Sequence, residues 1–304
     1  MALVSQSDLQ AEVCRRCHIV WLDQYEWDDV PRQEVEASEP PLPDAATEIM
    51  ASAELTAVKL RAQPGPFTPV MAPEHWWQWI LGFLGFPLRE GPSANHIPAV
   101  TWSVAALMIV VSVMGFGDVE GTVQNLGLVP ADPARLGGMT LLTSFLVHGS
   151  WFHLLGNLYF LLILGHHVEY RVGPWRTLAV IAAAALAGDL AHALLDPRPE
   201  LPLVGASAAV FGLLAFYAIA FRNTGFRLFI FLLYPPIMRW VRLSALGFFA
   251  LYMFFQMLGA SYQLGGWSDV SALAHIGGAL AGVIAYWGWR EAARHPWRSP
   301  KPVG

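Results

Sequence analysis

Charged residues are scarce in this chain. Lys, Arg, Asp and Glu together make up 13% of the 304 residues, whereas hydrophobic residues make up 55% and the mean hydropathy is +0.44. An ordinary soluble domain carries far more charge, so this composition excludes one. It indicates a polytopic membrane protein.

Basic residues are also too few for a nucleic-acid-binding surface. Residues 1–96 hold 14 acidic and 6 basic residues, and residues 97–304 hold 9 acidic and 12 basic ones. The first third is therefore a separate acidic region, and a surface that binds phosphates needs the opposite sign of charge. We expect no nucleic acid among the partners.

The chain has only two cysteines, Cys14 and Cys17, and His18 follows them. Their spacing is typical of half a zinc ribbon, but structural zinc usually takes four ligands. His18 as a third ligand, a site completed by a second chain and a motif remnant are open alternatives. The string also matches a c-type haem attachment, which is not expected on a cytoplasmic segment. We predict no metal and no cofactor at the functional site.

The start of the chain lacks the basic flank and apolar run of a cleavable signal peptide. Residues 1–30 form the half zinc-ribbon-like segment, and residues 31–73, rich in Pro, Ala and Glu, are typical of a flexible linker. Residues 74–96 contain three tryptophans near an apolar stretch. They predict an interfacial amphipathic helix on the inner leaflet, or a short helix packed over the bundle.

Long windows without charge fill much of the remaining chain. A helix needs about 20 apolar residues to cross a hydrocarbon core about 30 Å thick. The run from Leu228 to Met238 is shorter and contains Pro235-Pro236, so we expect an interfacial connection there. The predicted fold is all-α: a six-helix bundle over residues 97–290, a mostly irregular N-terminal region and a tail over 291–304. The six predicted spans are 98–117, 151–168, 177–195, 203–221, 243–263 and 270–289.

Lys and Arg are distributed unequally between the two sides of this predicted bundle. With a cytoplasmic N-terminus, the outer loops carry only Arg135 and Arg198, and the inner segments carry ten basic residues. Positive loops stay in the cytoplasm, so both termini are predicted to lie there, and the plasma (inner) membrane is the expected location. The ten are Arg171, Arg176, Arg222, Arg227, Arg239, Arg242, Arg290, Arg294, Arg298 and Lys301.

Two polar residues interrupt the apolar windows and need an explanation. Ser207 lies in the fourth span and His275 in the sixth, each within about two turns of the predicted outer end. Polar side chains at this depth usually have a function, and together these two would form a nucleophile and its base. Each also has a simpler interpretation. A serine can bond to its own helix, and a lone histidine can be a proton relay or a ligand.

The second span adds polar groups at the same depth. His153 and Asn157 are i, i+4 neighbours and share one helix face. In the third span, Asp189 and His192 are i, i+3 neighbours and predict a buried pair. The inner end of the second span carries Glu169 and Arg171, which we expect to fix that helix end and the following loop.

Small and aromatic residues surround the Ser–His pair in the sequence. Gly278 and Gly282 lie one turn apart and would allow the fourth span to approach closely, although such patterns are common wherever membrane helices pack. Gly205 relieves crowding just before the nucleophile. Phe211 lies four residues after Ser207 and is placed to pack on the imidazole.

Ordered motifs make residues 97–290 resemble the rhomboid family of intramembrane serine proteases. The resemblance implies that Ser207 is the nucleophile and His275 the general base, without a carboxylate. It implies an oxyanion hole made of His153, Asn157 and the backbone N–H of Ser207. The motifs are His148-x4-His153-x3-Asn157, Glu169-Tyr170-Arg171, Gly205-x-Ser207 and Ala274-His275-x2-Gly278-x3-Gly282.

Two positions differ from the common family pattern. Ala208 stands where the commonest motif has a second glycine, and Gly138-Met139-Thr140 stands where many members carry a Trp-Arg pair. The expected function is cleavage of single-pass or other membrane-anchored proteins that reach the site laterally from the lipid bilayer. The alternatives are a catalytically silent rhomboid-like protein that binds membrane helices, and a transporter that uses His153 and His275 as a proton path.

Overall fold

The computed structural model describes residues 2–6, 9–13, 20–21, 73, 75–91, 94, 96–232 and 237–294. The chain divides into two units, Met1–Thr68 and Pro69–Gly304. In the first unit, strands β1 (Ala2–Gln6), β2 (Leu9–Val13) and β3 (Val20–Trp21) form an antiparallel sheet in the order β1-β2-β3. The sequence does not predict this sheet. Cys14, Cys17 and His18 lie outside the described residues, as does nearly all of the predicted linker.

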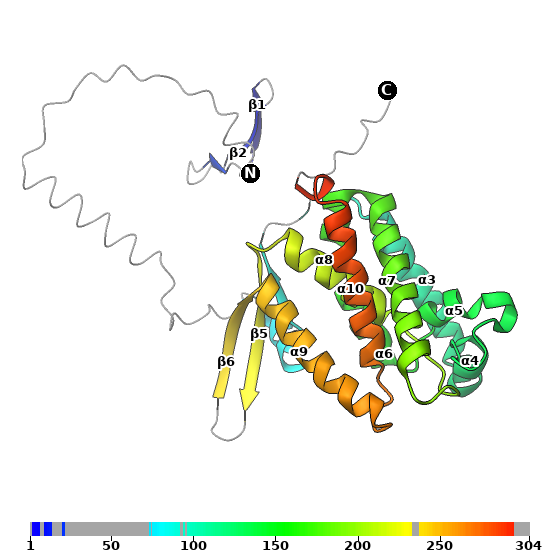
Figure 1. The fold of residues 1–304 in the computed structure, drawn as a ribbon. Helices are drawn as coiled ribbons and strands as arrows, with labels where there is room; N and C mark the ends of the chain where they lie inside the picture. Colours follow the sequence, from blue (N-terminus) through cyan, green and yellow to red (C-terminus); the bar gives the residue numbers. More distant parts are fainter. Residues whose placement is uncertain are drawn as a thin grey trace, which may run out of the picture. The chain divides into compact units, whose positions relative to one another are not determined.

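The second unit is mostly helical, and each predicted span contains a helix (Figure 1). Short helices α2 (Trp76–Phe83), α4 (Val119–Leu126) and α5 (Thr140–Leu146) accompany them. The longer apolar helices are α3 (Ala99–Gly115), α6 (Trp151–Val172), α7 (Pro174–Leu195), α8 (Ser207–Ala220), α9 (Ala245–Leu264) and α10 (Ala272–Gly288).

The apolar helices differ in length. Within the described residues, α7 and α9 are long and apolar enough to cross a membrane, and α5 with α6 passes as a pair bent by 93°. Helices α3, α8 and α10 are apolar but shorter. The 14 residues of α8 rise only about 21 Å, less than a hydrocarbon core of about 30 Å. The partly buried loop of residues 201–206 leads into this short helix.

That loop has partners for its backbone groups, as irregular backbone away from water requires. Leu203 and Leu128 exchange two backbone hydrogen bonds of 2.8 and 2.9 Å. Gly205 N–H donates to the carbonyl of Ser144 at 2.8 Å. The chain therefore arrives at the start of α8 in a fixed position.

Helix α8 lies at the centre of the bundle. Residues Ala208–Ala218 are all buried, because α6, α7, α9 and α10 pack around the helix. Small residues allow the closest of these contacts. A Cβ atom on Gly282 would lie 2.0 Å from the carbonyl oxygen of Gly212, so α10 approaches the backbone of α8 directly.

A second small sheet departs from the all-α prediction. Strands β4 (Leu88–Glu90), β5 (Gly225–Leu232) and β6 (Ile237–Ser244) pair antiparallel in the order β4-β5-β6. The expected interfacial connection is therefore a β-hairpin. Its apolar and aromatic residues suit strands. Glu90 bridges the strands through ion pairs with Arg227 and Arg242.

Helix α2 packs on this sheet. The Trp79 ring lies 5.5 Å from that of Phe229 and 5.7 Å from that of Trp240, in edge-to-face geometry. The opposite side of the helix, including Trp76 and Ile80, is exposed. The structure thus has a short helix packed on the small sheet, with an exposed apolar face on its other side.

Glu169 fixes a different helix from the one expected. Its buried carboxylate accepts hydrogen bonds from the N–H groups of Val100 (3.0 Å) and Thr101 (2.9 Å) and from the Thr101 hydroxyl (2.8 Å). The carboxylate therefore caps the start of α3, where unpaired N–H groups favour an anion. Arg171 lies over the ring of Phe221 at 4.6 Å.

Candidate active site

Ser207 and His275 meet at the starts of two packed helices. Ser207 is the first residue of α8, and His275 lies in the first turn of α10. Their Oγ and Nε2 atoms are 2.8 Å apart, which is hydrogen-bond distance. His275 is buried and Ser207 is half-buried.

The imidazole of His275 is held on two further sides. The Phe211 ring stacks on it with the centroids 4.4 Å apart and the planes 15° from parallel. Its Nδ1 lies 2.7 Å from Oε1 of Gln256, on α9. Gln256 is not among the site residues predicted from the sequence. The available signal was an amide inside an apolar helix, where polar residues are costly and often functional.

His153 and Asn157 lie beside the loop that precedes Ser207. Ser150 caps α6 by accepting from the His153 N–H at 3.2 Å, which starts the helix just before these two residues. A Cβ atom on Gly205 would lie 2.6 Å from Cε1 and Nε2 of His153. The Asn157 amide nitrogen donates to the His153 carbonyl at 3.1 Å.

A cleft opens between α6, α8 and α9. Its volume is about 200 Å³, and His153, Asn157 and Ser207 are among its lining residues. The rest of its lining is apolar apart from the hydroxyl of Tyr252. The structure therefore brings a serine hydroxyl, an imidazole and an amide together on one apolar cleft.

Ala208, one of the two departures from the family pattern, has room for its methyl group. A Cβ atom on Gly188 of α7 would lie 2.3 Å from that of Ala208. The glycine on α7 therefore leaves the space that the side chain at position 208 occupies.

His148 contacts the end of the loop that precedes Ser207. Its Nδ1 lies 3.0 Å from the Ser112 hydroxyl, and its Nε2 lies 3.5 Å from the N–H of Ala206. For Nε2 to accept this hydrogen bond, the ring proton must be on Nδ1. His148 is therefore a link from α3 to the residue that precedes Ser207.

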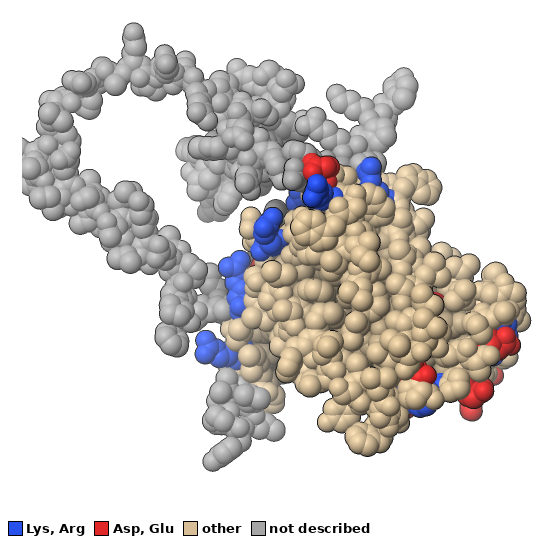
Figure 2. Space-filling view, viewed as in Figure 1, with Lys and Arg blue, Asp and Glu red and all other residues tan. Residues whose placement is uncertain are grey.

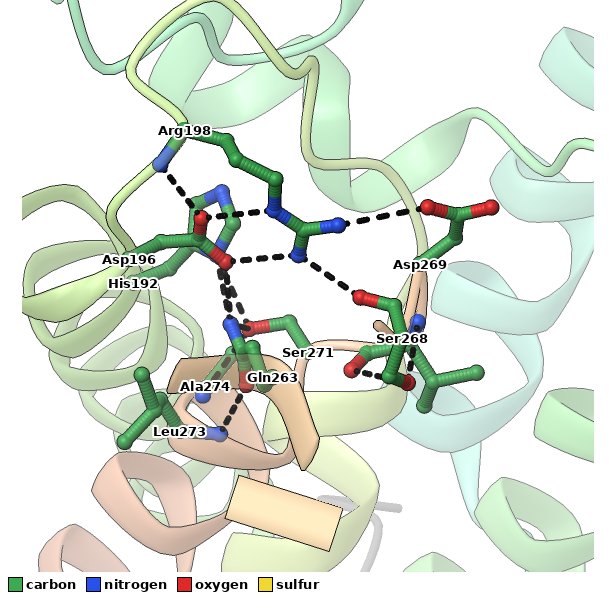
Figure 3. A network of polar contacts seen from close by, with 10 residues as sticks. His192, Asp196, Arg198, Gln263, Ser268, Asp269, Ser271, Leu273 and Ala274 are labelled. Carbon is green, nitrogen blue, oxygen red and sulfur yellow. Dashed lines mark hydrogen bonds and ion pairs between the residues drawn. The ribbon is translucent and has the colours of Figure 1, made fainter. Parts of the chain in front are cut away.

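A polar network ties the end of α7 to the start of α10 (Figure 3). Gln263 of α9 donates to Asp196 Oδ2 at 2.6 Å and accepts from the Leu273 N–H at 2.9 Å. Ser271 caps α10 by accepting from the Ala274 N–H at 3.2 Å. These contacts fix the helix start at Ala272, three residues before His275.

Arg198 extends this network to the loop between α9 and α10 (Figure 3). Its guanidinium bonds both oxygens of Asp196 at 3.1 Å and the Ser268 carbonyl at 2.6 Å. Burial acts to raise the pKa of Asp196, but hydrogen bonds from Arg198 and Gln263 outweigh burial and lower this pKa to about 2. Asp196 is therefore a carboxylate at neutral pH.

The predicted Asp189–His192 pair does not form. His192 Nδ1 lies 3.0 Å from the Ser271 hydroxyl and 3.6 Å from Asp196 Oδ2, so this histidine belongs to the network that holds α10. Oδ2 of Asp189 has no hydrogen-bond partner within the described part of the chain. The i, i+3 spacing placed both side chains in the core but could not show which neighbour each would meet.

Several packed apolar helices define an integral membrane protein, and a serine–histidine pair lies where two of them begin. Residues 136–291, just over half of the chain, match the family model of the Rhomboid domain. The chain belongs to the rhomboid family, which confirms the resemblance seen in the sequence.

Curated relatives agree with this family. Residue identity is 31% over 152 residues with Rhomboid-like protein 11, chloroplastic, of Arabidopsis thaliana, covering 48% of this chain and 50% of that protein. It is 31% over 143 residues with Rhomboid-related protein 1 of Caenorhabditis elegans, covering 47% and 37%. It is 36% over 74 residues with RHOMBOID-like protein 5 of Arabidopsis thaliana, covering 24% of each. The chain spans about half or less of the length of these relatives.

Proposed function

We propose that this chain is an intramembrane serine endopeptidase that cleaves membrane-anchored proteins within or near their transmembrane segments. The observation that carries the proposal is the 2.8 Å contact between His275 Nε2 and the Oγ of Ser207, which lines an apolar cleft. A serine hydroxyl is a weak nucleophile until a neighbouring base takes its proton, and the imidazole is the base within reach.

The reaction would proceed in two halves. Ser207 Oγ attacks the peptide carbonyl while His275 Nε2 accepts the hydroxyl proton, and the imidazolium then returns that proton to the departing amine. A water molecule next attacks the acyl-enzyme as His275 takes its proton. Transfer of this proton back to Ser207 Oγ releases the new carboxyl end and restores the enzyme.

The negative charge on the tetrahedral oxygen needs donors. His153 and Asn157 share the cleft with Ser207, and Ser207 begins α8, where the first N–H groups have no acceptor within the helix. Fixed donors in an apolar site stabilise such an oxyanion strongly, because no solvent has to reorganise during the reaction.

The proposed membrane arrangement has six spans, α3, α6, α7, α8, α9 and α10, with both termini in the cytoplasm of the plasma (inner) membrane. Its support is the distribution of charge. On the face drawn in Figure 2, basic side chains gather along the edge that holds β5, β6 and the end of α10, and others lie beside acidic ones at the opposite end. Positive segments face the cytoplasm, so the start of α8 points to the outer side. The short α8 then leaves Ser207 below the outer surface, with water reaching it from that side.

Substrates of this site are membrane-anchored proteins whose helices unwind. A helix keeps its carbonyls in backbone hydrogen bonds, so a peptide bond must leave the helix before Ser207 can attack it. The cleft lies between α6, α8 and α9, and its apolar lining suits a segment that comes from the bilayer.

A fluorophosphonate probe tests the proposal, used with the purified full chain in lipid vesicles. The wild type should be labelled and should cleave a reconstituted transmembrane substrate, whereas Ser207→Ala should do neither. Equal labelling of both proteins would place the reactive group elsewhere. An unlabelled and inactive wild type that still binds membrane helices would indicate the catalytically silent alternative.

A further inference from the structure

We propose that Gln256 is a positioning residue of the Ser–His pair. Its side-chain carbonyl would accept the Nδ1 proton of His275 and so fix the imidazole in the tautomer whose Nε2 takes the proton of Ser207. The inference rests on the proposed function and adds a third member to the pair, contributed by α9.

The hydrogen-bond chemistry of the two contacts carries this inference. A neutral imidazole has a proton on one nitrogen only. Gln256 Oε1 can only accept, so at 2.7 Å from Nδ1 it selects the Nδ1–H form. Nε2, 2.8 Å from Ser207 Oγ, is then free to accept the hydroxyl proton. In the other tautomer Nε2–H would donate to Ser207, and the base would be lost.

The position of Gln256 in α9 supports the same role. Phe255 and Met257, its neighbours in the chain, are 56% and 63% exposed, whereas Gln256 is half-buried and turned toward α10. Leaving an amide in apolar surroundings without a partner costs free energy, so the contact with His275 accounts for a polar residue here.

The surroundings of the imidazole explain why an amide suits this position. Phe211 covers one face of the ring. This stacking does not determine which ring nitrogen carries the proton, so a contact at Nδ1 is also needed. A carboxylate would hold Nδ1 as well, but it would place a net charge in an apolar site. Glutamine supplies the acceptor without the charge.

Two substitutions separate the acceptor from the other properties of the side chain. Gln256→Met keeps the length and loses the acceptor, whereas Gln256→Glu keeps an acceptor oxygen and loses the amide donor. Met257→Leu, on the exposed side of α9, is the matched control. Each variant is compared with the full wild-type chain in vesicles for kcat, KM, fluorophosphonate labelling rate and melting temperature.

We expect Gln256→Met to lower kcat and the labelling rate by about 10-fold or more, because general-base catalysis contributes on the order of 100-fold to 10,000-fold. KM and the melting temperature should stay close to those of Met257→Leu, and Gln256→Glu should recover most of the lost kcat. Wild-type kcat in Gln256→Met would overturn the inference. So would equal losses in the Met and Glu variants, since these would exclude an acceptor role.

Nitrogen NMR of histidine-labelled protein gives a readout that does not need activity. The signal that disappears in His275→Ala identifies His275, and it should report an Nδ1–H tautomer in the wild type that is lost in Gln256→Met. An Nε2–H tautomer in the wild type would overturn the inference. If the Nδ1–H tautomer is found in a chain that Ser207-directed probes do not label, the proposed function fails and the Gln256 contact stands.

Discussion

Gly278 of α10 lies directly against the backbone of Ala208, one residue after the proposed nucleophile. A Cβ atom on Gly278 would lie 2.0 Å from the carbonyl oxygen of Ala208, a distance that no side-chain rotation can relieve. The contact therefore fixes the spacing between α8 and α10. The same spacing sets the 2.8 Å distance between Ser207 and His275.

Gly278→Ala should separate these helices. Overpacking of this kind costs about 1–3 kcal/mol, and the shift should carry Nε2 of His275 out of reach of Ser207. We expect a lower melting temperature and loss of both cleavage and fluorophosphonate labelling. Gly288→Ala, near the end of the same helix with open space around it, is the control and should keep full activity. Normal cleavage by Gly278→Ala would show that the pair tolerates a wider spacing.

Position 205 requires glycine for two reasons: its backbone conformation, and the lack of room for a side chain beside His153. Its φ is +113°, which L residues rarely adopt, and a Cβ atom there would lie 2.6 Å from the His153 ring. Gly205→Ala should displace His153 and lower kcat by roughly 100-fold or more, as loss of an oxyanion donor does. Gly137→Ala is the control: its φ of +67° gives a similar backbone strain, but the space around it is open, so the new methyl group meets no side chain. Similar activity in the two variants would mean that His153 is not displaced or is not a donor.

The apolar helices could be predicted from the sequence because the hydrocarbon core excludes charge. Each predicted window contains a helix, with ends that differ by a few residues, and Ser207 and His275 were visible as polar interruptions. The sheet could not be predicted in the same way. The run from Leu228 to Met238 suits either a strand or a buried helix, and its partner β4 lies far upstream in the chain.

The long-range polar contacts also could not be predicted from the sequence. Gln256 is uncharged, so it does not interrupt a charge-free window, and its partner His275 follows 19 residues later on another helix. Gln263 and Asp196 are 67 residues apart and belong to no periodic pattern. A helical spacing places side chains on a face, but the neighbour across that face depends on how the helices pack.

Asp196, just beyond the end of α7, should make stability depend on pH in the acid range. Its pKa is about 2 in the folded chain, below the value of about 3.9 expected when unfolded. A depressed pKa stabilises the fold above the unfolded value, and this stability is lost as pH falls from about 4 through 2. The contribution to the free energy of unfolding is on the order of 1–2 kcal/mol. It is smaller than the full pKa difference would give, because Arg198 is partly exposed to solvent.

Asp196→Asn removes the charge that gives this pH-dependent stability and keeps the shape of the side chain. Its melting temperature should lie below that of the wild type at pH 6, and the difference should shrink as the pH approaches 2. Asp132→Asn, at an exposed position of the loop between α4 and α5, is the control and should follow the wild type. A constant difference between pH 6 and pH 2 would show that the charge of Asp196 does not stabilise the fold.

Asn157 should matter to the reaction and not to the fold. Asn157→Ala removes one proposed oxyanion donor, which should lower kcat by about 100-fold to 1,000-fold. His275→Ala removes the base itself and should abolish cleavage. Asn125 of α4 makes the same contact with its own helix, since its amide donates to the carbonyl of Gly121 at 2.8 Å, four residues earlier. Asn125→Ala therefore controls for the loss of that bond and should leave kcat unchanged. Equal kcat in the two alanine variants would remove Asn157 from the oxyanion hole, and the stabilising donors would then have to be His153 and the Ser207 N–H.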